Sequence, residues 1–408
     1  MSPQISSNGT AVTDKQMLGD WKETTLGTLI DFSNGRSSPD RIDSGKFFVY
    51  GSNGIIGKSD LANTPENTIV IGRVGSYCGS LYFSNSPCWV TDNAIKANPK
   101  DDNDPKYLFL LLQTLHLNKR AGGSGQPLIN QATLNAIEVR CPVPALQRRI
   151  AAILGCLDDK IDLLQKQNQT LEIIAQTLFK RWFVDFNFSN VDGKPYHENG
   201  GKMVEGEFGE APEGWRQMGL SGIAKFLNGL AMQKFPQNSH EYLPVIKIRE
   251  LNSGISDQTD KVGLSVPEEY VVQNGDILFS WSGSLELVIW NGGKGALNQH
   301  LFKVTSDEYP KWFYYFWIKH HLPNFRVIAS GKATTMGHIQ RHHLDEAIVN
   351  IPNQKILELS NTVFEPIFNK WNLNHLQIQS LAKLRDMLLP RLMTGNLSIL
   401  TQTDHAQR

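Results

Sequence analysis

The chain has 408 residues, 40% of them hydrophobic and 20% charged, which is enough for two or three globular domains with substantial cores. The chain has 40 basic residues, counting lysine and arginine, and 40 acidic residues, counting aspartate and glutamate. This balance argues against a protein that holds nucleic acid by bulk positive charge alone. The polar start lacks the pattern of a signal peptide, no apolar run is long enough to cross a membrane, and the four cysteines have no metal-ligand spacing, so we expect a reduced, cytoplasmic protein.

The first glycine-rich stretch, YGSNGIIGKS at residues 50–59, ends in the Gly-Lys-Ser of a nucleotide-binding P-loop. That motif requires a glycine where this chain has Ser52, and a helix that begins at the lysine. The residues that follow, DLANTPENT, contain Pro65 and show no helical periodicity. The stretch therefore predicts a turn between strands, and a P-loop-like NTPase is the less favoured alternative.

The chain repeats itself once. WKETTLGTLIDFSNG at residues 21–35 matches WRQMGLSGIAKFLNG at residues 215–229 without gaps. Further along, NTIVIGRVGS at residues 67–76 matches GDILFSWSGS at residues 275–284, and the spacing then settles at 210 positions. Each copy has the pattern of a mixed α/β globule followed by a long helix, so the sequence predicts a tandem duplication.

Acidic residues are missing from equivalent windows of the two copies. The sequence has none from residue 105 to 137 and none from residue 309 to 344. Each window also holds a small polar loop with glycine, NKRAGGSGQP at residues 118–127 and IASGKATTMGH at residues 328–338. Such loops bring backbone amides, hydroxyls and a cation near phosphates and base edges, so the windows favour a surface that faces a polyanion over a merely solvated basic face.

The end of each copy predicts a long helix with a coiled-coil seam. From Ile150, alternating steps of four and three residues reach apolar side chains at nine of ten positions, which is a period of 3.5, and Pro144 stands where a helix can begin. The second helix is less regular, since Ser360 and Arg385 interrupt its stripe and Pro366 is expected to kink it. The predicted seam residues are Ile150, Leu154, Leu157, Ile161, Leu164, Asn168, Leu171, Leu178, Phe364, Ile367, Trp371, Asn374, Ile378, Leu381 and Leu388.

The two helices have two possible partners. Each could pack on its own domain, but 33 residues span about 50 Å, which favours pairing of the helices with each other. In an antiparallel pair aligned over residues 150–182 and 360–392, facing residues have numbers that sum to 542, so Asn168 would face Asn374. A buried polar pair of this kind fixes the register of a coiled coil at some cost in stability.

Catalytic and metal-binding patterns are missing from the sequence. It has no G-x-G-x-x-G after a strand, no [DN]-P-P-[YF] run, no H-E-x-x-H and no G-x-S-x-G. The adjacent pairs His320-His321 and His342-His343 point in different directions on a helix or strand and are poor ligand sets for zinc. We therefore expect neither catalytic residues nor a metal site.

The order of the motifs resembles the specificity subunit of type I restriction–modification systems. The resemblance covers residues 15–397 and rests on W…L…F.NG, GSNGIIG, IGRVGS, GSGQPLINQATL, CPVPALQRRIAAIL, LFKRWFVDFNF, GKPY and EGW, followed by a recurrence of the set. It implies that each copy is a target-recognition domain that reads half of a split DNA sequence, without catalytic residues. It also implies that the paired helices act as a spacer and dock two methyltransferase subunits. Restriction subunits are then expected to join this core. S-adenosylmethionine, ATP and Mg are then expected in those partner subunits and no cofactor in this chain.

The resemblance and the repeat together predict seven segments. These are a flexible N-terminal tail at 1–14, target-recognition domain 1 at 15–143, a central helix at 144–186, a linker at 187–213, target-recognition domain 2 at 214–352, a C-terminal helix at 353–394 and a tail at 395–408. Candidate DNA contacts lie in or near the glycine-containing turns: Asn53, Arg73, Tyr77, Lys119, Arg120, Ser124, Gln126, Lys247, Arg249, Trp281, Lys332, Thr334, Thr335, His338 and Arg341. A stand-alone DNA-binding regulator is the remaining alternative, since it would share the charge pattern without needing the coil surface.

Overall fold

The computed structural model describes residues 21–122, 127–189, 193–238, 240–331 and 337–397. The chain divides into two compact units, unit 1 with residues 1–161 and 380–408, and unit 2 with residues 162–379. Each unit therefore contains one globular domain and one end of both long helices.

Unit 1 is built on an antiparallel sheet with strand order β2-β8-β5-β6. All five residues of the central strand β5, TIVIG, are buried, and helix α3 packs on the sheet after an N-cap in which Asp104 accepts from Tyr107 N at 2.8 Å. The elements up to α5 are β1 (Trp21–Thr25), α2 (Leu26–Leu29), β2 (Ile30–Asn34), β3 (Phe47–Gly51), β4 (Gly54–Ser59), β5 (Thr68–Gly72), β6 (Leu81–Ser84), β7 (Trp89–Val90), β8 (Ala94–Pro99), α3 (Pro105–Thr114), α4 (Gln131–Asn135) and β9 (Glu138–Pro142).

The stretch that resembles a P-loop is a β-hairpin. Strands β3 and β4 pair antiparallel, with Gly51 opposite Gly54, and Gly54 takes the positive φ of 95° that such a tight turn requires. Strand β4 continues through Lys58 and Ser59, so no helix begins at the lysine. The NTPase alternative is therefore wrong, because the phosphate-binding helix end that it requires does not exist here.

Unit 2 repeats the topology of unit 1. Its main sheet has the order β13-β20-β17-β18, its second sheet is β15-β14-β19-β16 where unit 1 has β4-β3-β7, and β12–β21 corresponds to β1–β9. The elements are β10 (Met203–Gly206), β11 (Gly209–Pro212), β12 (Arg216–Gly219), β13 (Lys225–Asn228), β14 (Leu243–Ile246), α6 (Ile248–Ser253), β15 (Lys261–Val262), β16 (Val271–Val272), β17 (Asp276–Ser280), β18 (Leu287–Trp290), β19 (Gly295–Leu297), β20 (Leu301–Thr305), α7 (Lys311–Ser330), α8 (Arg341–Glu346) and β21 (Ile348–Ile351). The predicted tandem duplication is thus confirmed.

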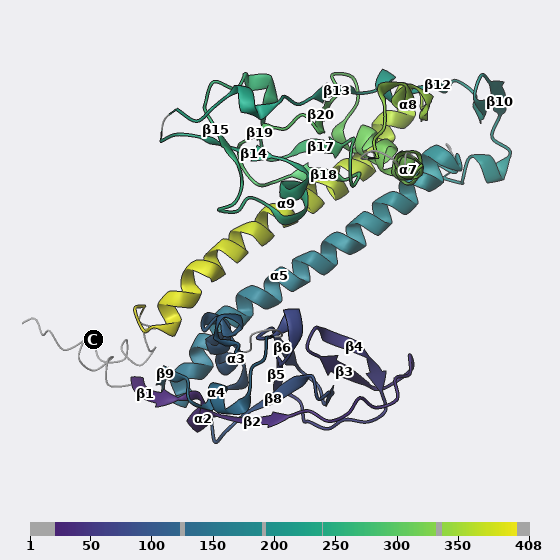
Figure 1. The fold of residues 1–408 in the computed structure, drawn as a ribbon. Helices are drawn as coiled ribbons and strands as arrows, with labels where there is room; N and C mark the ends of the chain where they lie inside the picture. The colour runs from purple at the N-terminus through teal and green to yellow at the C-terminus, as the bar shows by residue number, and fades with distance from the viewer. Residues whose placement is uncertain (1–20, 123–126, 190–192, 239, 332–336, 398–408) are drawn as a thin grey trace, which may run out of the picture. The chain divides into compact units, whose positions relative to one another are not determined.

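Helices α5 (Pro144–Phe179) and α9 (Gln354–Met393) are the long helices of the chain (Figure 1). Helix α5 begins at Pro144, as predicted, and continues as a π-helical turn over Lys180–Val184, whereas α9 runs through Pro366 without ending there. In unit 1 the start of α5 and the end of α9 share one apolar core with α3, and in unit 2 the end of α5 and the start of α9 share another with α7. The helices are therefore antiparallel, and neither packs on its own domain alone.

The apolar seam between the helices has two buried polar interruptions in unit 2, Ser360, whose Oγ donates to Ile356 O at 2.7 Å, and the pair Asn168 and Asn374. Asn374 Nδ2 donates to Asn168 Oδ1 at 2.9 Å, which is the pairing that the register hypothesis predicts, and both side chains are buried. In unit 1, Arg385 leaves the stripe and forms an ion pair of 2.9 Å with Asp158. Of the other predicted seam residues, Ile150, Leu154, Ile161, Leu164, Phe364 and Trp371 are buried, and Leu157, Leu171, Leu178, Ile367, Ile378, Leu381 and Leu388 are half-buried.

A membrane span is not found among the described helices, since none has the necessary length and apolar character together.

Candidate nucleic-acid interface

The loop after β5, residues 73–80, organises the candidate contacts of unit 1. Gly72 ends the strand, and a Cβ there would lie only 2.3 Å from Tyr77 O and 2.7 Å from Ser52 O. The hairpin turn that carries Asn53 therefore closes on the loop that carries Arg73 and Tyr77. Asn53 and Tyr77 are both exposed beside this contact.

The basic residues of the acid-free window lie against the same loop. Gly79 has a φ of 84°, and a Cβ there would lie 2.4 Å from Asn118 N, so the 3₁₀ helix Leu117–Arg120 packs directly on it. Lys119 and Arg120 are exposed at this point. The structure thus brings Asn53, Arg73, Tyr77, Lys119 and Arg120 around one loop, while Ser124 and Gln126 lie outside the described residues.

The equivalent loop of unit 2 borders a hollow of about 270 Å³. Trp281 lines it, and its indole N–H donates to Asn228 Oδ1 at 2.8 Å and to Gln299 O at 3.2 Å. His338 faces the tryptophan edge-on at 6.3 Å between ring centroids, and Arg341, the first residue of α8, lines the hollow as well. These three candidates therefore share one surface, while Lys332, Thr334 and Thr335 lie outside the described residues.

Lys247 and Arg249 are occupied by acidic partners. Lys247 forms an ion pair with Asp260 and thereby lowers the pKa of that carboxyl, and Arg249 Nη2 lies 2.8 Å from Oε1 of Glu250, which is buried. Glu250 also accepts from Thr259 Oγ1 at 3.1 Å. The two cations thus stabilise the fold around α6, next to the Trp281 loop, where Gly283 lies against Ile248.

The acid-free window of unit 2 has a structural origin over most of its length. Helix α7 is the centre of the core, and Trp312, Trp317 and the residues between them are all buried. Its cations have internal partners: Lys311 Nζ donates to Gly275 O at 2.7 Å, Lys319 pairs with Glu172 at 2.9 Å, and Arg326 donates to Leu285 O at 2.8 Å. The prediction of a polyanion-facing surface is therefore wrong for this helix.

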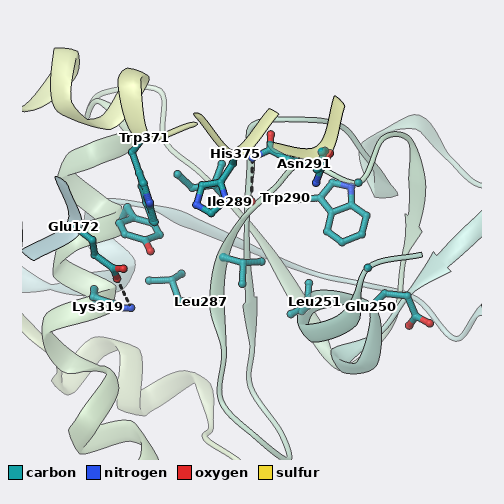
Figure 2. Close-up of a pocket in the computed structure, with 15 residues that line it drawn as sticks. Glu172, Glu250, Leu251, Leu287, Ile289, Trp290, Asn291, Lys319, Trp371 and His375 are labelled. Atoms are coloured by element: carbon teal, nitrogen blue, oxygen red, sulfur yellow. Dashed lines mark hydrogen bonds and ion pairs between the residues drawn. The ribbon is translucent and has the colours of Figure 1, made fainter. Parts of the chain in front are cut away.

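A second hollow of unit 2, about 350 Å³, lies between β18, α6 and α7 and the two long helices (Figure 2). The Glu172–Lys319 ion pair stands at one end of the row of lining residues and Glu250 at the other. Apolar side chains of Leu287 and Ile289 lie between them, and burial lowers the pKa of His375. This hollow could not be predicted from the sequence, because its lining comes from segments far apart in the chain.

One group of possible metal ligands occurs among the described residues. The ligand atoms of His342, His343 and Glu346 lie within 4.8 Å of one another on α8. However, His343 Nδ1 accepts a hydrogen bond from Gln340 N at 3.0 Å, so the neutral ring carries its proton on Nε2 and has no lone pair left for a metal. The geometry identifies His343 as part of the N-terminal cap of α8.

Comparison with known proteins decides what these two domains are. The family model described as "Type I restriction modification DNA specificity domain" matches residues 19–173 and 212–381, once for each copy. The chain belongs to the type I restriction–modification specificity family. It is accordingly a DNA-recognising specificity subunit without catalytic activity of its own, which assembles with methyltransferase and restriction subunits, so the alternative of a stand-alone regulator is wrong.

The specificity-family relatives cover most of the chain. The MjaIX specificity subunit of Methanocaldococcus jannaschii is 30% identical over 347 residues, 82% of this chain and 78% of the relative. The HindI specificity subunit of Haemophilus influenzae is 24% identical over 356 residues, 72% of this chain and 77% of the relative. The crystal structure of an S subunit from M. genitalium has the same fold, with a TM-score of 0.63 and 15% identity over 98% of this chain and 100% of that one.

Proposed function

We propose that each target-recognition domain of this specificity subunit, residues 15–143 and 214–352, reads one half of a bipartite DNA site. The observation that supports this most directly is the repeated topology with different side chains on equivalent loops. A single fold that presents Arg73 in one copy and Trp281 in the other is suited to bind the same DNA geometry with different base preferences.

The long helices would set the spacing between the half-sites. Helix α5 has 36 residues, which at about 1.5 Å per residue is roughly 54 Å long. One turn of DNA measures about 34–36 Å, so readers attached to such a helix can reach the same face of a duplex about one turn apart. The base pairs between the two half-sites would then be left unread.

The outer faces of the long helices suggest two docking sites for one kind of partner. Leu163 and Ile174 on α5 are 49% and 43% exposed, and eleven residues of α-helix place them on the same face. Leu373 and Leu384 on α9, each 210 positions later, are 60% and 39% exposed. Because exposed apolar residues recur at equivalent positions, we assign these faces to two methyltransferase subunits.

Phosphate and base contacts would come from the loops described above. Lys119, Arg120 and Arg341 are exposed and suited to phosphate, and Asn53, Tyr77, Trp281 and His338 are suited to base edges or sugars. Lys247 and Arg249 would contact phosphate only after exchanging their acidic partners. Ser124, Gln126, Lys332, Thr334 and Thr335 remain proposed contacts on sequence grounds. The methyltransferase and restriction subunits would bring S-adenosylmethionine, ATP and Mg to the complex. The complex would act in the cytoplasm.

Domain exchange tests the proposal. Residues 21–143 are replaced by the equivalent segment of another specificity subunit, the protein is expressed with its methyltransferase subunits, and the methylated motif is determined by sequencing. We expect one half of the motif to change while the other half and the spacer length stay the same. The reciprocal exchange of residues 215–352 should change the other half only, and a change of both halves in either chimaera would contradict independent readers.

The docking sites have a separate test. Leu163→Glu and Leu373→Glu should each weaken the binding of methyltransferase subunits, because a charge in an apolar interface is expensive to desolvate. Leu61→Glu serves as the control, since Leu61 is a similarly exposed leucine, at 58%, that belongs to recognition domain 1 and not to either long helix. Size-exclusion chromatography with light scattering reports how many partner subunits each variant retains, and equal retention by all three would refute the assignment.

A further inference from the structure

The two recognition domains share a backbone clamp on the loop that follows their central strand. In unit 1, Ile129 N donates to Arg73 O at 3.0 Å and Gly75 N donates to Pro127 O at 3.0 Å. This ties the loop to the segment before α4, and it makes Val74 and Leu128 a β-bridge. The clamp therefore holds Arg73 at a fixed place.

Unit 2 has the same clamp with different side chains. Ile339 N donates to Trp281 O at 2.9 Å, Gly283 N donates to Gly337 O at 2.9 Å, and Ser282 bridges His338. Trp281 thus occupies the backbone position that Arg73 occupies in unit 1. An invariant backbone with a changed side chain is the arrangement expected where two domains discriminate between different ligands of one kind.

The hydrogen-bonding state of the two side chains differs. The indole N–H of Trp281 already donates hydrogen bonds within unit 2. Trp281 therefore contributes only its apolar ring to the hollow that it lines. The Arg73 side chain has no hydrogen-bond or ion-pair partner among the described residues, and its Nε is completely buried. The Nη donors of Arg73 are not among the buried unpaired atoms, so an external acceptor can bind them and offset the desolvation of the guanidinium group.

From these contacts we propose that Arg73 is the specificity-determining residue of recognition domain 1 and reads the acceptor edge of a guanine. This proposal rests on the proposed function of that domain as a half-site reader. Arginine is the side chain whose paired donors match guanine O6 and N7 in the major groove. The same loop also carries the exposed Tyr77, and the neighbouring hairpin turn carries the exposed Asn53. Lys119, on the 3₁₀ helix against this loop, is suited to a phosphate of the DNA backbone. Trp281 at the equivalent place gives recognition domain 2 no such donor, and its apolar face fits a thymine methyl group instead.

The test uses the complex with methyltransferase subunits and determines the methylated motif for Arg73→Gln and for Arg73→Lys. With Arg73→Gln, we expect the preference for guanine at one position of one half-site to fall about tenfold to a hundredfold, with a gain for adenine, which glutamine pairs with. With Arg73→Lys, guanine should remain the preferred base. The other half-site should be unaffected in both variants. Arg36→Gln is the matched control, because Arg36 is an exposed arginine of the same domain and its loss removes the same charge.

Stability separates a reading role from a structural one. Arg73→Met keeps the length of the side chain and removes the partly buried, unpartnered charge, so the free protein should unfold at a higher temperature than the wild type. A lower unfolding temperature would show that Arg73 supports the fold and would overturn the proposal. An unchanged motif with Arg73→Gln, or a uniform loss over all sequences as a phosphate contact would give, would overturn it as well. Domain exchange decides independently whether this domain reads a half-site at all.

Discussion

The polar layer of the helix pair can be tested by replacing Asn168 and Asn374 with leucine, singly and together. Asn374 Nδ2 donates to Asn168 Oδ1 at 2.9 Å, and Asn168 Nδ2 donates to Trp371 O at 3.3 Å. The two side chains are 5% and 1% exposed, so solvent cannot replace a lost partner. Asn374 Oδ1 is buried and has no hydrogen-bond partner among the described residues.

The magnitudes follow from these contacts. Either single substitution removes the hydrogen bond between the asparagines and leaves the remaining one with unpaired polar groups, which costs about 1–3 kcal/mol. The new leucine offsets part of that cost, since a fully buried leucine contributes about 1.5–3 kcal/mol. The double substitution keeps both apolar gains and leaves no unpaired asparagine in the seam. We therefore expect the free energy of unfolding of the double variant to lie about 1–3 kcal/mol above the value that adding the two single effects gives. The double variant should also be more stable than the wild type.

Urea unfolding at constant pH and salt measures this, with tryptophan fluorescence as the probe. Asn369→Leu is the control, because Asn369 is an exposed asparagine of the same helix and its substitution should change the free energy of unfolding little. Additive single effects, or a double variant less stable than both single ones, would refute the view that the two side chains form one buried polar unit.

Other substitutions test the remaining parts of the chain. Lys119→Ala and Arg341→Ala should each weaken DNA binding for all sequences and lower the slope of log K against log salt by about 1, which fluorescence anisotropy at several salt concentrations measures. Leu164→Ala should destabilise the protein by about 2–5 kcal/mol, because Leu164 is 1% exposed, and Leu157→Ala, at a half-buried position, should cost less in the same urea assay. Burial lowers the pKa of His321 from 6.5 to about 4, so the unfolded chain binds this proton first as the pH falls. The free energy of unfolding should therefore decrease by up to about 3 kcal/mol between pH 6.5 and 4, and His321→Gln should reduce that decrease.

The duplication and the helix register could be predicted from the sequence because both are one-dimensional patterns. The recurring motifs, whose spacing settles at 210 positions, and the period of 3.5 residues are properties of the chain itself, and Pro144 marks the start of α5 directly. Asn168 and Asn374 stood out because each interrupts its apolar stripe at a place where the other can meet it. Arg385 interrupts the stripe too, but its ion pair with Asp158 could not be foreseen from periodicity alone.

The partners of individual charges were not predictable, because they depend on tertiary contacts. Lys319 and Glu172 are 147 positions apart in the sequence, and only the packing of α7 on α5 brings them to 2.9 Å. Lys247 forms an ion pair with Asp260, and no pattern in the sequence indicates that these two residues meet. The absence of acidic residues over α7 therefore reflects the burial of an aromatic helix rather than a surface property.

The charge balance of the chain is compatible with DNA recognition, because tertiary contacts decide which charges remain available for DNA. Most cations of the second acid-free window are used inside the fold, so net charge and available charge are different quantities. Among the described residues, Lys119 and Arg341 form no ion pair, and both lie at the loops that the backbone clamps hold. Since the contribution of phosphate to affinity grows with each contact, the cations of α7 that have partners inside the fold add little to it. We therefore expect the loops held by the backbone clamps to provide discrimination between sequences, and the attraction to the duplex to be shared with the partner subunits.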